Sequence, residues 1–401
     1  MKNRKLRICY FLPISSAHSR VFLDSLSDRG HRLFYFCYKN KVFKDWDKMK
    51  VEEEIIEGNS NNKWELRTIT KVLFMIIPES FKSIIYYLYY LRFQRLIKKQ
   101  LFKISPDILH AHYISRNGIY AYLSDFEPYV LTIWGSDIRT DSFSKYQSKL
   151  FNKSLENAAA VTSGSKELLR IGQEKGAKFD LSYFIGMPGI KIEKYNNIKV
   201  PYKFYQNLDI PNDSSIIFSP RAMDPLYRIN IIIEAFCDLC QLNDNLYLII
   251  LDYSTVEKYL SLIKTMISTE KIQNKVRILS NLPLPYPDFN LLYAISSITI
   301  SIPKTDGMPK TVYESFAAGC PVIASDLTTY DGIIDHEQTG LRVSGDNAKE
   351  LSDAVLKILN DKILKKRIIN NGKDIVSKYG NIDVEMEKME KLYYSLANNY
   401  L

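Results

Sequence analysis

Short apolar runs alternate with longer helical patterns along this chain, and the alternation restricts the possible folds more than any other feature. Most runs are apolar almost throughout, as expected for strands that are buried on both faces. The segments between them repeat apolar residues at helical spacing. Strand and helix units that alternate in this way build parallel sheets covered by helices, so the sequence predicts an α/β fold.

The alternation occurs twice. Between Ile198 and Ser215 the periodicity disappears and Pro, Asn and Asp accumulate, which is typical of a linker. At 401 residues the chain also exceeds the size at which a single core stops growing. We therefore expect an N-terminal domain at 1–198, a C-terminal domain at 199–385, and a terminal helix at 386–401 that crosses back to the N-terminal domain.

The expected elements follow from these patterns, with no assignment for 40–70. The first half should contain strands near 6–12, 32–38, 107–113, 129–133, 158–162 and 181–185. Its helices should lie near 18–29, 79–103, 115–125, 142–157 and 165–175. In the second half we expect strands near 215–219, 246–252, 275–279, 297–302, 321–324 and 341–343, and helical structure over 347–399.

The five cysteines are odd in number and lie in apolar contexts, which favours a reduced, cytoplasmic protein over a disulfide framework. Cys237 and Cys240 form a C-x2-C within a helical pattern. No second Cys or His pair lies nearby, so we interpret this pair as core packing rather than a metal site.

Positive charge is concentrated in the first 120 residues, which contain 22 Lys/Arg and 11 Asp/Glu against 32 and 34 in the remainder. This asymmetry indicates an anionic partner of the first domain, such as a phospholipid surface or a lipid-diphosphate-linked acceptor. Nucleic acid is disfavoured because no binding motif is present. The alternative is an ordinary solvated surface.

The segment from Ile84 to Leu91 contains four tyrosines and is followed by Arg92, Arg95 and further cations. Aromatic rings and cations in this arrangement are typical of a helix at a membrane interface, although a domain helix is also expected here. No apolar run approaches the roughly 20 residues of a membrane span.

Asp306 and Glu314 bracket a turn at Gly307 that opens a helix. Backbone N–H groups at such a helix start can bind an anion. Glu314, one turn inside the helix, can accept two ribose hydroxyls, and Asp306 can accept hydroxyls of a hexose held against the phosphates. The residues of the expected anion site are Gly307, Met308, Pro309, Lys310 and Thr311.

This stretch resembles the E-x7-E signature of retaining glycosyltransferases of family 4, with Asp306 and Glu314 at the two acidic positions. Further segments resemble the family in family order: 106–113, 132–137, 160–165, 188–190, 219–221 and 335–341. The resemblance implies the GT-B architecture, in which two Rossmann-like domains face each other across a cleft. It also implies a nucleotide sugar bound mainly by the C-terminal domain, with no cofactor and no metal.

On the donor side, Arg221 resembles the arginine of the family's G-R-x5-K pattern, whose guanidinium holds the diphosphate bidentately. Six residues later the family has lysine, whereas this chain has Tyr227 followed by Arg228. Arg228 offers the second cation from a neighbouring position. The resemblance thus assigns catalysis to Arg221, Asp306 and His112, since His112 matches the histidine that faces the donor sugar.

On the acceptor side, Ser136 and Asp137 match the family's G-[ST]-D loop; alternatively, Asp137 caps the following helix. Ser15, Ser16 and His18 stand where many members have a Gly-Gly loop. These three residues either contact an acceptor or contribute nothing.

Two remaining features are interpreted as structural. His110 lies two positions before His112 and is expected to be satisfied within the fold. Asp45 and Asp47 form a D-x-D among lysines, without a flanking strand, so we expect no metal there.

The expected function is transfer of a hexose or N-acetylhexosamine from a nucleoside diphosphate sugar to a glycan acceptor, with retention of configuration. A lipid-linked acceptor at the inner face of the cell membrane would suit capsule, O-antigen or exopolysaccharide synthesis, with the enzyme cytoplasmic and peripheral. The alternatives are a GT-B sugar-nucleotide epimerase or phosphorylase, or a non-catalytic glycosyltransferase-like subunit.

Overall fold

The chain divides into two compact units, Met1–Pro188 with Glu385–Leu401, and Gly189–Val384. The computed structural model describes residues 4–14, 16–38, 42–46, 79–139, 143–185, 189–196, 198–280, 289–308 and 310–399. The division precedes the stretch that we expected to be a linker. That stretch instead carries helix α8 (Tyr202–Leu208), whose Phe204 and Leu208 are buried in the second unit. Two apolar residues four positions apart were enough for a short helix that the surrounding polar residues concealed.

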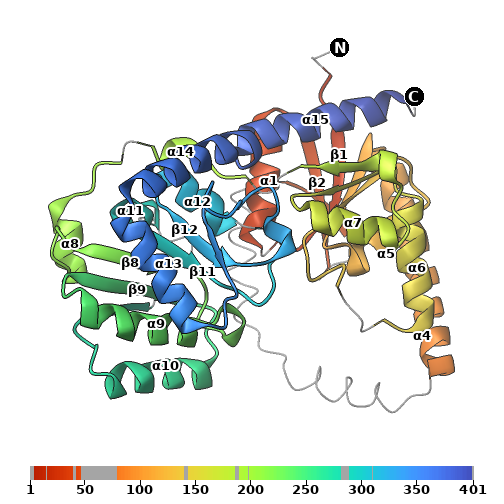
Figure 1. The fold of residues 1–401 in the computed structure, drawn as a ribbon. Helices are drawn as coiled ribbons and strands as arrows, with labels where there is room; N and C mark the ends of the chain where they lie inside the picture. Colours follow the sequence, from red (N-terminus) through yellow and green to blue (C-terminus); the bar gives the residue numbers. More distant parts are fainter. Residues whose placement is uncertain are drawn as a thin grey trace. The chain divides into compact units, whose positions relative to one another are not determined.

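The first unit contains a seven-stranded sheet in the order β3-β2-β1-β4-β5-β6-β7. Figure 1 labels its neighbouring strands β1 and β2. Its strands are β1 (Arg7–Phe11), β2 (Arg32–Cys37), β3 (Val42–Asp45), β4 (Ile108–His112), β5 (Tyr129–Ile133), β6 (Ala160–Ser163) and β7 (Ser182–Phe184). Its helices are α1 (Ala17–Asp28), α4 (Glu79–Ile104), α5 (Ile114–Leu123), α6 (Lys145–Glu156) and α7 (Lys166–Glu174). All pairings are parallel except that of the edge strand β3, which runs antiparallel to β2.

The second unit contains a parallel six-stranded sheet in the order β10-β9-β8-β11-β12-β13. Its strands are β8 (Ser215–Ser219), β9 (Leu246–Asp252), β10 (Val276–Ser280), β11 (Ile298–Ser301), β12 (Val322–Ser325) and β13 (Leu341–Val343). Besides α8, its helices are α9 (Ile229–Leu242), α10 (Glu257–Thr269), α11 (Phe289–Ile295), α12 (Lys310–Ala318), α13 (Ala348–Asn360) and α14 (Lys362–Tyr379). The expected α/β class with two Rossmann-like sheets is confirmed.

Both sheets have a switch point, where the chain reverses the direction in which it adds strands. It lies between β1 and β4 in the first unit and between β8 and β11 in the second. In open α/β sheets, ligands bind beyond the carboxyl ends of the strands at such points. The residues that follow these four strands are therefore the first candidates for a site.

Apolar side chains fill the core of each unit as the sequence patterns require. Every residue of β4 is buried, and α9 presents buried Ile229, Ile232 and Phe236 at helical spacing. Cys237 and Cys240 lie half-buried on α9 and pack against the same core. Within the described ranges, no group of three or more metal-ligating side chains comes together.

Helix α15 (Ile382–Asn399) begins in the second unit, and its residues from Glu385 onward belong to the first. The Tyr393 hydroxyl lies 3.2 Å from that of Tyr10 on β1, and Glu390 lies 2.8 Å from the buried His31 ring. These contacts attach the C-terminal part of α15 to the first unit. Among the described helices, none has the length and hydropathy needed to cross a membrane.

Candidate active site

The switch point of the second unit is occupied by an ion pair. Arg221 follows β8, Asp306 follows the adjacent β11, and the two side chains are in direct contact. The Arg221 Nε group also donates to Ser301 Oγ at 2.7 Å, and the Tyr330 hydroxyl donates to Asp306 Oδ2 at 2.8 Å. We call Arg221, Ser301, Asp306 and Tyr330 the switch-point cluster.

Electrostatics keep the arginine of this cluster charged. Burial lowers the pKa of Arg221, but the neighbouring Asp306 and Tyr330 outweigh that effect and hold the pKa above its ordinary value. The ring of Tyr227 lies 5.3 Å from the guanidinium and adds a cation–π contact. Tyr227 therefore contacts Arg221 at the position where the family motif has a lysine.

Most of the Arg221 guanidinium is bonded within the switch-point cluster. Its Nε is bonded to Ser301, and its Nη2 to Asp306 and Tyr330. Within the described part of the chain, only Nη1 has no hydrogen-bond partner. Nη1 can thus donate to an anion without breaking any of the bonds that Nε and Nη2 make in the cluster.

The turn that opens α12 also uses some of the N–H groups expected to bind an anion. The Gly307 amide donates to Asp306 Oδ1 and the Lys310 amide donates to the Met308 carbonyl, both at 2.9 Å. Pro309 lies outside the described residues. The Thr311 hydroxyl, by contrast, is buried without a partner in the described ranges. The Asp306 carboxylate thus accepts one of the backbone N–H groups that we expected to bind an anion.

Glu314 lies one turn inside α12 and is only 5% exposed. The hydroxyl of Tyr195 donates to its Oε1 and that of Tyr293 to its Oε2, each at 3.0 Å. Lys310 Nζ lies 3.4 Å from Oε1. The second acid of the motif is therefore a buried carboxylate held by two hydroxyl donors, with one ammonium group nearby.

Arg228 adopts a left-handed backbone conformation (φ 53°) at the start of α9. Its Nη1 lies 3.4 Å from the Pro303 carbonyl, just beyond β11. A Cβ on Gly345, just beyond β13, would approach the same nitrogen to 2.6 Å. Arg228 thus places a second cation at the carboxyl ends of these strands. Its guanidinium fits there because Gly345 has no side chain.

In the first unit, Asp137 is used by the backbone. Its carboxylate accepts N–H bonds from Ile114 at 2.8 Å, Gly135 at 2.7 Å and Trp134 at 3.0 Å. Burial raises the pKa of this carboxyl, and the backbone donors lower it in part. Asp137 therefore caps α5, the helix after β4, rather than the helix that follows it in sequence. Ser136 is exposed.

The two histidines of β4 differ in their contacts. His110 is bonded to the hydroxyls of Tyr393 and Thr132, which confirms that it is satisfied within the fold. His112 is fully buried, and neither ring nitrogen has a hydrogen-bond partner in the described ranges. Its ring lies 4.7 Å from that of Phe22, and burial lowers its pKa to about 3. His112 is thus a neutral imidazole with no hydrogen bond to any residue that the structure describes.

Of the three residues that replace the family's Gly-Gly loop, Ser16 precedes α1 and lies beside Tyr113, which follows β4. Ser15 lies outside the described residues, as does the side chain of His18. The Tyr113 ring stacks on Trp134 with centroids 5.0 Å apart. Sequence reasoning missed this aromatic pair, although both residues directly follow strands.

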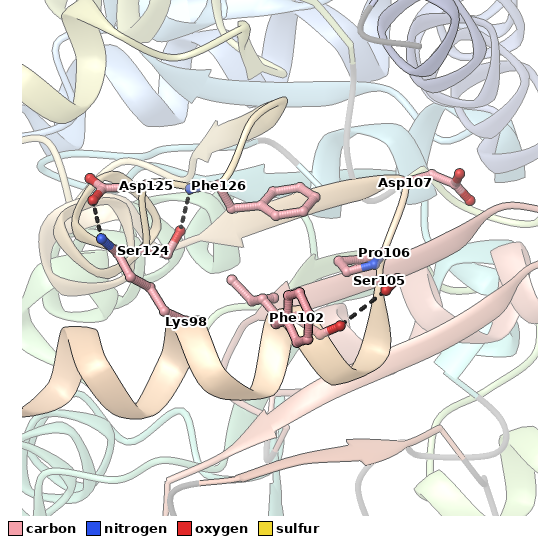
Figure 2. Close-up of a pocket in the computed structure, with 9 residues that line it drawn as sticks. Lys98, Phe102, Ser105, Pro106, Asp107, Ser124, Asp125 and Phe126 are labelled. Atoms are coloured by element: carbon pink, nitrogen blue, oxygen red, sulfur yellow. Dashed lines mark hydrogen bonds and ion pairs between the residues drawn. The ribbon is translucent and has the colours of Figure 1, made fainter.

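A hollow of about 620 Å³ lies at the amino ends of β4 and β5 in the first sheet (Figure 2). Residues that precede β4 and β5 line it, so it is separate from the carboxyl ends that carry His112 and Asp137. Its charges are paired, Lys98 with Asp125 inside the lining and Asp107 with Arg4 outside it. The lining residues are Lys98, Leu101, Phe102, Ser105, Pro106, Asp107, Ser124, Asp125 and Phe126.

Comparisons with known proteins agree with this geometry. Residues 203–375 match the family Glycosyl transferases group 1, and residues 7–165 match the family Glycosyl transferase 4-like. The chain is 24% identical over 277 residues to the putative teichuronic acid biosynthesis glycosyltransferase TuaC of Bacillus subtilis, covering 66% of this chain and 64% of that protein.

Two solved structures share the fold over nearly the whole chain. A glycosyltransferase from Rickettsia africae has a TM-score of 0.76 at 19% identity, covering 99% of this chain and 100% of its own. Anabaena HepE in complex with UDP has a TM-score of 0.74 at 14% identity, covering 98% and 100%. With one family matched in each unit and this fold throughout, the chain belongs to the GT-B glycosyltransferases of the group 1 and family 4-like type.

Proposed function

We propose that this protein transfers a hexose or N-acetylhexosamine from a nucleoside diphosphate sugar to a glycan acceptor, with retention of configuration, in cell-envelope polysaccharide synthesis. The observation that carries the proposal is the pairing of Arg221 with Asp306 at the switch point of the second unit, with Glu314 on the helix that follows. The UDP complex of Anabaena HepE and the teichuronic acid assignment of TuaC support the donor and acceptor classes.

The second unit supplies the groups that such a donor requires. The free edge of Arg221, together with Arg228 and the Thr311 hydroxyl, would bind the diphosphate and stabilise the charge that develops on it. Glu314 would accept a ribose hydroxyl. Asp306 would contact the sugar, and His112 keeps the sugar-facing role that the family resemblance implies.

Retention is proposed through front-face displacement. Both acids of the motif are held by neighbouring donors, Asp306 by Arg221 and Tyr330 and Glu314 by two tyrosines. Neither acid is thus placed as a free nucleophile. The leaving phosphate would then take the proton of the acceptor hydroxyl, and catalysis would depend on positioning and charge stabilisation.

We further propose that no metal takes part, because arginines already supply positive charge beside the expected phosphates. Transfer should therefore continue at an unchanged rate in EDTA, measured as release of nucleoside diphosphate. Loss of activity on chelation and its recovery with Mn²⁺ or Mg²⁺ would contradict this assignment.

The acceptor is proposed to be lipid-linked and presented at an anionic membrane surface, with the protein peripheral at the inner face. Helix α4 packs into the core through Tyr90, Phe93, Ile97 and Leu101. The residues that alternate with these at helical spacing are exposed and combine apolar side chains with cations, as interfacial helices do. They are Ile85, Leu88, Arg92, Arg95, Lys99 and Phe102.

Binding of a nucleotide tests the donor assignment directly. Glu314→Ala should weaken the affinity for the preferred nucleoside diphosphate by about tenfold or more, because it removes a charged hydrogen-bond acceptor. Isothermal calorimetry with UDP, GDP and ADP measures this. If the variant binds as tightly as the wild type, the ribose assignment of Glu314 is wrong.

A further inference from the structure

The segment 189–196 is fixed onto the second unit directly after the chain enters it. The Ile190 amide donates to the Gly380 carbonyl at 2.7 Å, and the Asn290 side chain donates to the Lys194 carbonyl at 2.8 Å. Tyr195 also packs at the edge of two apolar clusters of this unit. The Tyr195 side chain is therefore held in place from both ends of its segment.

This placement brings the Tyr195 hydroxyl within hydrogen-bond distance of the Glu314 carboxylate. Its hydroxyl and that of Tyr293 on α11 approach the two carboxylate oxygens separately, each at 3.0 Å, and the two rings meet at 6.2 Å. Burial and the adjacent carboxylate raise the pKa of both tyrosines, so both hydroxyls keep their protons and act as donors. The Glu314 carboxylate is thus fixed in plane and direction before any ligand arrives.

The donors also limit what Glu314 can still accept. A carboxylate has about four acceptor positions, two on each oxygen. On Oε1 one position is taken by Tyr195, and the Lys310 ammonium lies 3.4 Å from the same oxygen as an ion pair; on Oε2 one position is taken by Tyr293. One position on Oε2 therefore remains for a ligand, on the oxygen that Lys310 does not contact.

We propose that Tyr195 and Tyr293 are positioning residues that aim the open position of Glu314 Oε2 at one ribose hydroxyl of the donor nucleotide. This inference rests on the proposed function, and it narrows the sequence-based expectation that Glu314 accepts two hydroxyls. Tyr195 is the better residue to change, because it is only partly buried, whereas Tyr293 lies wholly in the core.

The experiment compares Tyr195→Phe with the wild type by calorimetry, using UDP, GDP and ADP and the 2′,3′-dideoxy form of whichever binds. The variant should bind the ribonucleotide about tenfold more weakly, the loss expected for one hydrogen bond to a charged group. It should bind the dideoxy form as tightly as the wild type does, because that ligand has no hydroxyl for Glu314. If Tyr195 had a merely structural role, the variant's affinity for both ligands would fall alike.

Two controls isolate the contact. Tyr259→Phe removes a hydroxyl that bonds Asn230 in the same unit, and it should leave both affinities unchanged. In a Glu314→Gln background, Tyr195→Phe should lose most of its effect on ribonucleotide affinity, since the pair is then already broken.

The possible outcomes separate the two proposals. Suppose that the wild type binds a ribonucleotide. If Tyr195→Phe binds it equally well, or if the variant's affinity falls by the same factor for the ribonucleotide and the dideoxy form, the positioning role is overturned and the proposed function stands. If the wild type binds none of the three nucleotides, the proposed function falls, and the positioning role falls with it.

Discussion

The two sheets have corresponding switch points, but the residues there have opposite character. Beyond β8 and β11 lies an ion pair, Arg221 with Asp306, bonded to the hydroxyl groups of Ser301 and Tyr330. In the first unit, β4 ends at the uncharged and fully buried His112, and the ring of Tyr113, directly after β4, stacks on Trp134, directly after β5. The same architecture thus carries a charged pair at the switch point of one unit and an uncharged, aromatic group at the switch point of the other.

The difference separates two kinds of recognition. A charged edge with a free guanidinium nitrogen suits a diphosphate, whereas aromatic faces and a neutral imidazole suit the apolar faces and hydroxyls of sugars. The first unit carries its excess positive charge elsewhere, as on the exposed face of α4. In the second unit, charge lies where binding is proposed; in the first, the positive excess lies away from the strand ends, where the Asp137 carboxylate is bonded to backbone amides.

The largest expected effect comes from breaking the charged edge. Arg221→Met leaves the Asp306 carboxylate without its cation in a site where both side chains are nearly buried. Removal of one partner of a buried pair costs about 3–5 kcal/mol, so the free energy of unfolding should fall by about that amount and transfer should be lost. Urea unfolding and a transfer assay measure the two effects.

The double variant Arg221→Met/Asp306→Asn serves as the control, because it removes both charges. It should regain much of the lost stability while remaining inactive. A loss of no more than about 1 kcal/mol in the single variant would indicate a solvated pair and would remove the contrast between the two edges.

The neutral edge should show itself in the pH dependence of stability. The folded-state pKa of His112, about 3, lies below its ordinary value of 6.5. Between these values the unfolded chain binds a proton that the folded chain excludes, so stability falls as pH falls through this window. The slope is about 1.4 kcal/mol per pH unit for one such histidine.

His112→Phe keeps a ring among the surrounding aromatic side chains and removes the titration. Its unfolding free energy, measured at steps between pH 6.5 and 4, should decline less steeply than that of the wild type by about this slope. His110, whose pKa is also lowered by burial, should continue to destabilise both proteins in acid. Parallel curves would show that His112 is protonated in the fold.

The smallest effect on folding is expected at α4. Arg92, Arg95 and Lys99 are exposed and form no ion pair in the described ranges, whereas Lys98 pairs with Asp125. Replacing these three by Gln should release the protein from anionic vesicles, since each cation near such a surface contributes on the order of 1 kcal/mol. The melting temperature should not change, because no buried contact is lost.

A vesicle flotation assay at low and physiological salt measures this binding, which salt should weaken. The matched control replaces Lys258, Lys264 and Lys362, three exposed cations of the second unit, by Gln. If both variants float as the wild type does, or the wild type does not float at all, the exposed face of α4 is only a solvated surface.

Much of the fold was predictable because its signals are local. Every expected strand is present within two residues at each end. The exceptions have physical causes. Strand β3 has no pattern of its own, because an edge strand is defined by pairing with β2. Helix α8 was hidden among Pro and polar residues, and only its burial in the second unit identifies it.

The sequence by itself determined which residues follow which strand, and therefore that Arg221, Asp306, Glu314 and His112 lie at carboxyl ends or on the next helix. The tertiary structure alone decided their partners. Arg221 meets Asp306 across 85 positions, and Tyr195 meets Glu314 across 119. Periodicity extends over one element at a time, whereas such contacts depend on strand order and on the packing of separate helices. For that reason the motif residues were visible in the sequence, while Ser301, Tyr330, Tyr195 and Tyr293 emerged only from the fold.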